Sequence, residues 1–330
     1  MTSEATSERV TATATATDAY AARESGRRRR GITIAVGAAL ISGIAVFVNG
    51  YGVAAVPDAT VYTTAKNLVA ATLLAGLAGA GLLGRTGRRP TAVAQPRRPT
   101  RLVGLLAVGV IGGSLPFVLF FEGLARAGTT QAAFLHKTLI VWVALLGVPL
   151  LGERLRAVHM GAIALLLSGQ VVLGGGIGGW AGSGELLILA ATLLWAVEVI
   201  VAKRLLRDLD PATLGVARMG IGVLLLVGWV AVSGRWNEFV GLNARGWGWA
   251  ALTGAILAGY VATWFTALSL APAIDVTAVL VLAAVVTGLL NVAVKGAALS
   301  GATTAGMVLI AAGTVLAVVA RPRAPQPVQP

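Results

Sequence analysis

The sequence contains no cysteine and only two histidines, His136 and His159, in 330 residues. Disulfides, thiolate catalysis and cysteine-ligated metal centres are therefore excluded, and a histidine-rich metal site is not expected. The glycine runs at 112–113 and 174–176 lack the lysine of a phosphate-binding loop, which argues against an ATP-driven step. We expect no metal and no cofactor.

Charge is also scarce. Only 12% of the residues are charged and 57% are hydrophobic, whereas a soluble domain has about 25% charged residues. A chain of this composition cannot cover a water-facing surface in the usual way, which all but excludes a soluble enzyme and a disordered or fibrous protein. The net charge is +13, and the arginines lie in short clusters between apolar runs. This placement is typical of membrane orientation signals rather than of nucleic-acid binding.

Ten apolar stretches approach the roughly 20 residues that a helix needs to cross a bilayer. They lie near residues 31–51, 60–84, 102–121, 129–151, 157–174, 184–203, 213–233, 247–269, 274–294 and 302–320. We therefore predict an all-α integral membrane protein with ten transmembrane helices.

The two ends of the chain do not fit this pattern. Residues 1–30 contain a threonine–alanine alternation (TATATAT) with no apolar face to bury and end in four arginines, which predicts a disordered basic tail. A secretory signal is disfavoured because the apolar run at 31–50 is too long and has no clear cleavage site. Residues 321–330 are proline-rich and form a second predicted tail.

Positive charge predicts the orientation. With the N-terminus in the cytoplasm, 19 lysines and arginines fall inside and four outside, as the positive-inside rule requires. This distribution predicts an even number of spans, with both termini on the cytoplasmic side of the plasma membrane.

The chain also repeats itself. A shift of 144 residues aligns Phe121 with Phe265 and Gly169 with Gly313, without a gap over about 50 residues. VPDAT at 56–60 likewise resembles LDPAT at 209–213. Two repeats of five spans, at 31–174 and 184–320, must insert in opposite orientations because five is odd. Inverted repeats around a central site are a recurring design of secondary transporters.

A more specific resemblance rests on the stretch from Phe120 to Leu173. It contains the turn Leu151-Gly152-Glu153-Arg154-Leu155, followed by a helix with Gly161, Ala162, Leu165 and Gly169. With GELLILAATLLWAVEVIVAKRLLRDLDPATLGVARMGIGVLLL in the second half, the chain resembles the drug/metabolite transporter superfamily in its ten-helix EamA branch, over roughly residues 31–320.

The resemblance implies a secondary transporter, but the chain departs from the family pattern in two ways. The prolines that the family has in its fourth and ninth helices are absent at 138–142 and 282–286. Ala297 stands where the second repeat would carry its own glutamate turn. These departures put in doubt any backbone opening in the two helices.

Ionisable side chains are costly in a bilayer, so those inside the spans are candidate site residues. Glu198, which shares a helix face with Trp195, is a candidate proton- or cation-binding carboxylate, or else the structural partner of a buried base. Lys137 could hold a substrate carboxylate or neutralise Glu122 or Glu198. His136 could bind substrate or relay protons, or simply hydrogen-bond to a neighbouring helix.

The remaining candidates have plainer interpretations beside the functional one. Glu122 is expected to pair with Arg126 four residues later. Lys66 and Arg218 are expected to reach lipid headgroups at the two mouths, or alternatively to attract an anionic substrate there. The candidates for lining a pocket are Trp142, Trp195, Trp264 and Gln131, for which plain packing is equally consistent.

Together these features predict a transporter of small metabolites, such as amino acids or related compounds, with alternating access and with export favoured over import. Expected partners are a small-molecule substrate and the lipid bilayer, with protons and a second copy of the chain (a homodimer) as further candidates. The alternative is a non-transporting scaffold or a divergent transporter with an altered mechanism. An enzyme is disfavoured because the sequence has no His-x-x-x-His motif and no paired aspartates.

Overall fold

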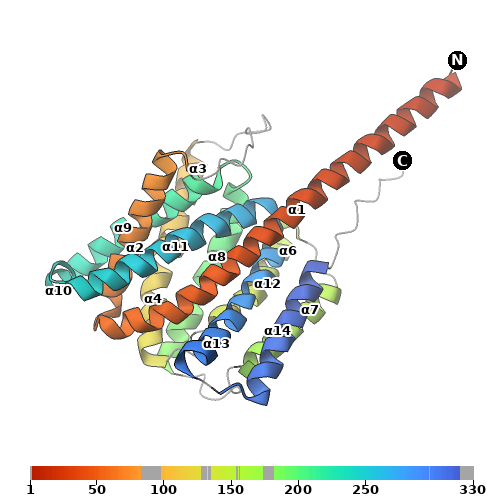
Figure 1. Cartoon of the computed structure of the whole chain (residues 1–330). Coiled ribbons are helices and arrows are strands. Elements are labelled where there is room, and N and C mark those ends of the chain that lie inside the picture. The colour runs from red at the N-terminus through yellow and green to blue at the C-terminus, as the bar shows by residue number, and fades with distance from the viewer. Residues whose placement is uncertain are drawn as a thin grey trace.

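The computed structural model describes residues 2–82, 98–127, 132, 135–153, 155, 157–173, 182–296 and 298–319, and contains no strand within them. Figure 1 shows the helices packed side by side as a bundle. The helices are α1 (Thr2–Ala55), α2 (Ala59–Gly79), α3 (Arg98–Val108), the π-helical segment η1 (Gly109–Ser114), α4 (Leu115–Ala127), α6 (Leu139–Leu151), α7 (Ala157–Leu173), α8 (Ser183–Leu205), α9 (Pro211–Val232), α10 (Trp236–Val240), α11 (Ala244–Leu270), α12 (Ala273–Leu280), α13 (Leu282–Lys295) and α14 (Gly301–Val319).

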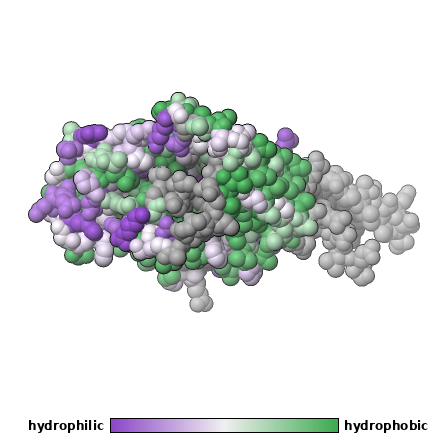
Figure 2. Space-filling view, turned by 90° about the horizontal axis from the view of Figure 1, so that it is seen from below, coloured by the Kyte–Doolittle hydropathy of each residue, from purple (hydrophilic) through white to green (hydrophobic). Residues whose placement is uncertain are grey.

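Seven helical segments are long and apolar enough to cross a membrane. They are Ala22–Ala55, Pro99–Ala127, Ser183–Leu205, Pro211–Val232, Ala244–Leu270, Ala273–Lys295 and Gly301–Val319. Large apolar side chains such as Leu224 and Val232 are 74% and 79% exposed, which suits a lipid-facing surface. In Figure 2 hydrophilic side chains gather at the left end, and most of the other coloured surface is hydrophobic. The chain is therefore a multi-pass membrane protein.

Three further apolar helices are shorter or more polar. Leu135–Leu151 and Ala157–Val172 have fewer than 18 residues. α2 has 21 residues, but its first half carries buried polar side chains that include Lys66 and Asn67. It ends at Gly79 rather than near residue 84 as predicted, because the chain turns at Gly81, where φ is +69°.

The helix α1 includes the residues for which the sequence predicts a tail. The helix begins at Thr2, and Figure 1 shows its first part projecting beyond the bundle. The arginine run is also engaged, because Arg28 donates a 2.7 Å hydrogen bond to Asp275 and a second, at 3.2 Å, to the carbonyl of Val318. These contacts fix the beginning of the first apolar stretch against the last helices of the chain.

Local structure recurs at the spacing that the sequence repeat predicts. α6 ends at Gly152 (φ +70°) and α13 ends at Gly296 (φ +66°), 144 residues later. A left-handed residue at a helix end is the conformation that glycine adopts without strain. Asp58 and Asp210 also play one role, since each carboxylate accepts a hydrogen bond from the backbone N–H three residues on and caps α2 or α9.

The helices that lack the family prolines are nevertheless interrupted. Thr138 is a turn before α6, and Val281 separates α12 from α13. At both points the backbone makes hydrogen bonds across three residues, from Val141 N to Thr138 O and from Ala284 N to Val281 O. Both repeats therefore have a tightened turn at the position where the family has its proline.

α7 and α14 pack closely on each other through glycines. A Cβ on Gly169 would lie 2.8 Å from the carbonyl oxygen of Gly306, and one on Gly313 would lie 2.9 Å from Leu166. The two glycines are equivalent in the repeat, and small residues of this kind let membrane helices approach closely.

We expect Gly169→Ala to lower the melting temperature of the detergent-solubilised protein by several degrees, since overpacking costs about 1–3 kcal/mol. Gly228→Ala is the matched control, because a Cβ there has nothing within 4 Å. Equal melting temperatures of the two variants would contradict this close packing.

Candidate functional site

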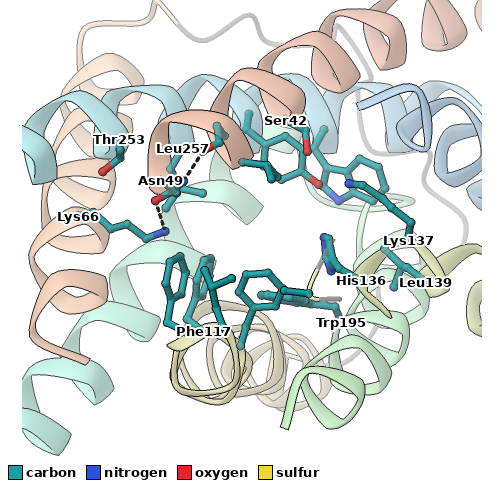
Figure 3. A pocket seen from close by; sticks show the side chains of 18 of the residues that line it. Ser42, Asn49, Lys66, Phe117, His136, Lys137, Leu139, Trp195, Thr253 and Leu257 are labelled. Carbon is teal, nitrogen blue, oxygen red and sulfur yellow. Dashed lines mark hydrogen bonds between the residues drawn. The ribbon is translucent and has the colours of Figure 1, made fainter. Parts of the chain in front are cut away.

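A cavity of about 140 Å³ lies in the middle of the bundle. Its wall combines side chains from the first half of the chain with side chains from the second, and both halves contribute aromatic rings to it. The residues used below are Ser42, Asn49, Lys66, Phe117, Phe120, Phe121, His136, Lys137, Trp195, Glu198, Arg218, Thr253, Leu257, Tyr260 and Trp264. Figure 3 shows Lys66 on one wall and His136 and Lys137 on the other.

Glu198 of α8 and Arg218 of α9 form a buried ion pair in this wall. Arg218 Nε donates to Glu198 Oε1 at 2.6 Å and Nη2 donates to Oε2 at 3.2 Å. The side chains are only 3% and 7% exposed. The carboxylate is fully engaged by its partner, and the guanidinium also lies 5.5 Å from the ring centre of Phe117.

The glycines of η1 allow this pair to be buried. Side chains on Gly112 and Gly113 would collide with the Glu198 carboxyl group and with the backbone oxygen of Arg218. The Gly112 carbonyl accepts a 3.2 Å hydrogen bond from the indole of Trp195. The two glycines therefore let the first half of the chain pack directly on the ion pair. This close packing, and not phosphate binding, is the role that the structure gives to the glycine run at 112–113.

Lys66 is held by polar and aromatic neighbours instead of by a carboxylate. Its Nζ donates to Asn49 Oδ1 at 3.2 Å and lies 3.8 Å from the ring centre of Phe121. The Tyr62 hydroxyl lies 2.8 Å from the same Asn49 oxygen and 3.0 Å from Thr253 Oγ1. These contacts tie α1, α2 and α11 together at one wall.

His136 and Lys137 lie on the opposite wall and lack such partners. The imidazole packs edge-on against Trp195, with ring centres 4.9 Å apart, and against Phe120 at 5.4 Å. Within the described residues, neither His136 Nδ1 nor Lys137 Nζ has a hydrogen-bond partner. Lys137 is 4% exposed, so its ammonium group is buried at the edge of the cavity.

The structure thus brings most of the predicted site residues together. Glu198, His136, Lys137, Trp195 and Trp264 all line the cavity. Trp142 does not, and its indole instead donates to Thr138 Oγ1 at 3.3 Å. Gln131 lies outside the described residues.

Lys66 and Arg218 were expected at the mouths, and this prediction is wrong. Both are buried and line the cavity, because α2 and α9 pack on each other and their first turns face inward.

Lys137 does not neutralise a glutamate, since Glu198 pairs with Arg218 and Glu122 makes the predicted pair with Arg126 at 3.3 Å. Within the described part of the chain, no group of three acidic or histidine side chains could hold a metal ion.

Several wall residues had not been selected from the sequence. Tyr260 stacks on Trp264 with ring centres 5.9 Å apart. The sequence did contain a signal for Tyr260, because it lies four residues before Trp264 and therefore on the same face of one helix. No sequence signal marked Ser42 and Thr253 as cavity residues, because small polar residues recur throughout apolar helices.

A network at the junction of α11 and α12, which we call the junction network, joins the two halves. It consists of Arg28, Glu153, Lys203 and Asp275. Glu153 accepts hydrogen bonds from the backbone N–H groups of Ala273 (2.7 Å) and Ile274 (3.0 Å), the first two residues of α12. A carboxylate at this position is favoured by the unpaired N–H groups and positive end of the helix.

Two further contacts complete the junction network. Lys203 donates to the carbonyl oxygens of Leu268 and Ala271, and Arg28 pairs with Asp275 at 2.7 Å. Burial raises the pKa of Glu153 above its ordinary value of 4.5, although the two backbone hydrogen bonds and Lys203 act in the other direction.

A second set of ion pairs joins the halves near the start of α2. Arg235 lies 2.8 Å from Asp58 and 3.9 Å from Glu122, whose carboxylate also accepts a hydrogen bond from Thr60 at 2.9 Å. Arg28 belongs to the junction network, and Ala55, the last residue of α1, is three residues before Asp58 of the second set. The two residues are about 40 Å apart along α1, at 1.5 Å per residue. The two sets therefore lie at opposite ends of the bundle, with the cavity between them.

The buried ion pair predicts a non-additive effect on stability. Glu198→Gln and Arg218→Gln each leave an unpaired buried charge, which costs about 3–5 kcal/mol. We expect each single variant to lower the melting temperature more than the double variant does. Thermal unfolding in detergent measures this, and additive losses would show that the two side chains do not depend on each other.

The raised pKa of Glu153 predicts a pH effect. Its proton binds more tightly to the folded than to the unfolded protein, so its contribution to stability is present at low pH and is lost as the pH rises through the folded pKa. The melting temperature of the natural protein, relative to Glu153→Gln, should be highest below about pH 4.5 and should fall as the pH rises through the folded pKa. Glu238→Gln, at an exposed position on α10, is the control, and the same pH trend in it would refute this assignment.

Comparison with known proteins supports the transporter architecture. None of the curated proteins compared with the chain matches it. One solved structure, described only as "Crystal structure of protein", is similar with a TM-score of 0.67 at 21% identity, covering 88% of this chain and 97% of that one, so the two share a fold. The model of the EamA-like transporter family matches residues 29–175 and again 182–319, which confirms the resemblance seen in the sequence. The chain therefore belongs to the EamA-like transporter family, which indicates a membrane transporter of small molecules.

Proposed function

We propose that this protein is a secondary transporter that moves a small metabolite through the central cavity by alternating access. The observation that carries the proposal is the cavity itself, in which both halves of the chain contribute buried ionisable side chains, Lys66 and Lys137 from one half and Glu198 and Arg218 from the other. Such groups are expensive in a bilayer and mark substrate or ion pathways.

The proposed architecture is ten transmembrane helices in two inverted repeats. The seven long apolar segments, the two shorter ones and α2 together make ten. The recurrence of Gly152 at Gly296 supports two equivalent units, and five helices per unit would reverse the second unit in the membrane. With the arginine clusters on the inside, both termini are cytoplasmic and the junction network lies on that side of the plasma membrane.

In this scheme the two ion-pair sets are the two gates. The junction network closes the cytoplasmic end by joining Glu153 to the start of α12, and Arg235 with Asp58 closes the outer end. Alternating access requires one set to open while the other holds. The turns at Thr138 and Val281 are placed to absorb the change, because each interrupts a helix between the two ends.

Protons are the proposed coupling ion, and amino acids and related compounds form the first substrate panel. His136 is the proposed proton relay because it faces the cavity and its Nδ1 has no partner within the described residues. Loading proteoliposomes with the panel and imposing a pH gradient tests coupling, direction and substrate together. A scaffold would give no flux under any of these gradients.

The absence of cysteine makes a direct test of alternating access possible. A single cysteine at Ser42, which lines the cavity, should react with a membrane-impermeant thiol reagent added from either side of the membrane. Ser168→Cys, at an exposed position of α7, is the control and should react with neither because it faces lipid. Reaction of Ser42→Cys from one side only, together with no flux, would favour the scaffold.

A further inference from the structure

The ammonium group of Lys137 is a cationic group of the described cavity wall that the contacts above leave without a hydrogen-bond partner. It is buried and has no hydrogen-bond partner in the described part of the chain, although its residue lines the cavity. We propose that Lys137 anchors the anionic group of the substrate, and that the substrate is a small organic monoanion with an apolar body. This inference rests on the proposed function, since it takes the cavity to be the transport site.

The protein's own carboxylates do not serve Lys137. Glu198 is the carboxylate among the described lining residues, and both of its oxygens accept hydrogen bonds from Arg218. No ion pair joins Lys137 to any described acidic residue, whereas Glu122, Glu153 and Asp275 are all engaged at the two ends of the bundle. A buried ammonium without a counter-charge is costly, so an anion that enters the cavity gains the interaction that the protein leaves open.

The second lysine differs in this respect, which makes Lys137 the anchor. Lys66 is on the far wall and is already hydrogen-bonded to Asn49 and stacked over Phe121. It adds positive potential to the cavity, but its ammonium group already has a hydrogen-bond acceptor, which that of Lys137 does not have within the described residues. Because the Glu198–Arg218 pair is neutral as a unit, the two lysines leave the cavity positive.

The rest of the wall specifies an apolar body. Phe120, Trp195 and Trp264 line the same cavity as Lys137, with the ring centres of Phe120 and Trp195 5.5 Å apart, and Leu257 adds an aliphatic side chain. A cavity of about 140 Å³ has room for several water-sized volumes, which suits a small metabolite better than a large one.

The cavity wall disfavours a zwitterionic substrate, because its described carboxylate and amide acceptors already have partners. The ammonium group of an amino acid would need an acidic partner, and the one carboxylate on the described wall is held by Arg218. The Asn49 oxygen is occupied by Lys66 and Tyr62. The structure therefore favours an organic acid over the corresponding amino acid.

The test measures binding to the purified full-length protein, separately from transport. The probes are 3-phenylpropionate, its neutral amide 3-phenylpropionamide and the zwitterion L-phenylalanine, titrated by calorimetry and by the fluorescence of the cavity tryptophans. We expect the carboxylate to bind at least about tenfold more tightly than the other two, as a charge-assisted hydrogen bond in a buried site provides.

Substitution then assigns this preference to one side chain. Lys137→Gln should weaken carboxylate binding by about tenfold or more and leave amide binding unchanged, whereas Lys137→Arg should keep the preference. Lys295→Gln makes the same change at an exposed lysine outside the cavity and should bind all three probes like the natural protein.

Several results would overturn the inference. They are equal binding of the three probes, no binding of any of them up to about 10 mM, or an unchanged carboxylate preference in Lys137→Gln. If Lys137→Gln does not fold, the ranking of the three probes in the natural protein and in Lys137→Arg decides. Carboxylate-selective binding without flux would contradict only the proposed function, and flux without carboxylate preference would contradict only this inference.

Discussion

The bilayer imposes one constraint on which the rest of this structure depends: each charge buried between the helices needs a partner inside the protein. The Glu198–Arg218 pair meets it in full, with two hydrogen bonds, at 2.6 and 3.2 Å, between neighbouring helices. Lys66 meets it through an amide oxygen and an aromatic ring. Lys137 does not meet it within the described residues, and for that reason the cavity is best understood as a site completed by its ligand.

The packing around these charges follows from small residues at helix crossings. Glycines 112 and 113 bring η1 against α8 and α9, and Gly169 with Gly313 brings α7 against α14. These tight crossings lie between the two halves, because η1 and α7 belong to the first half and α8, α9 and α14 to the second. The contacts between the halves at the two ends of the bundle are instead ion pairs and hydrogen bonds. Polar contacts of this kind can break and form again without repacking a core, which is what a gate requires.

The sequence predicted much of this arrangement because hydrophobic runs, caps and repeats are local signals. Asp58 and Asp210 cap their helices where the two related motifs place them, and Gly152 and Gly296 end theirs. The turns at Thr138 and Val281 had no sequence signal, since they form without the family prolines. The contacts of Arg28 with Asp275 and Val318 had no such local signal, because the partners lie 247 and 290 residues away from it in the sequence.

The sequence by itself determined that the chain is a membrane protein and which few ionisable residues lie in its spans. It also determined which orientation in the membrane its charges favour. Only the tertiary structure decided which of those residues face one another. It moved Lys66 and Arg218 from the mouths into the cavity wall, excluded Trp142 from it, and gave Glu198 a partner 20 residues away. The physical reason is that helical periodicity defines the face of a side chain, whereas only the packing of distant helices decides what that face meets.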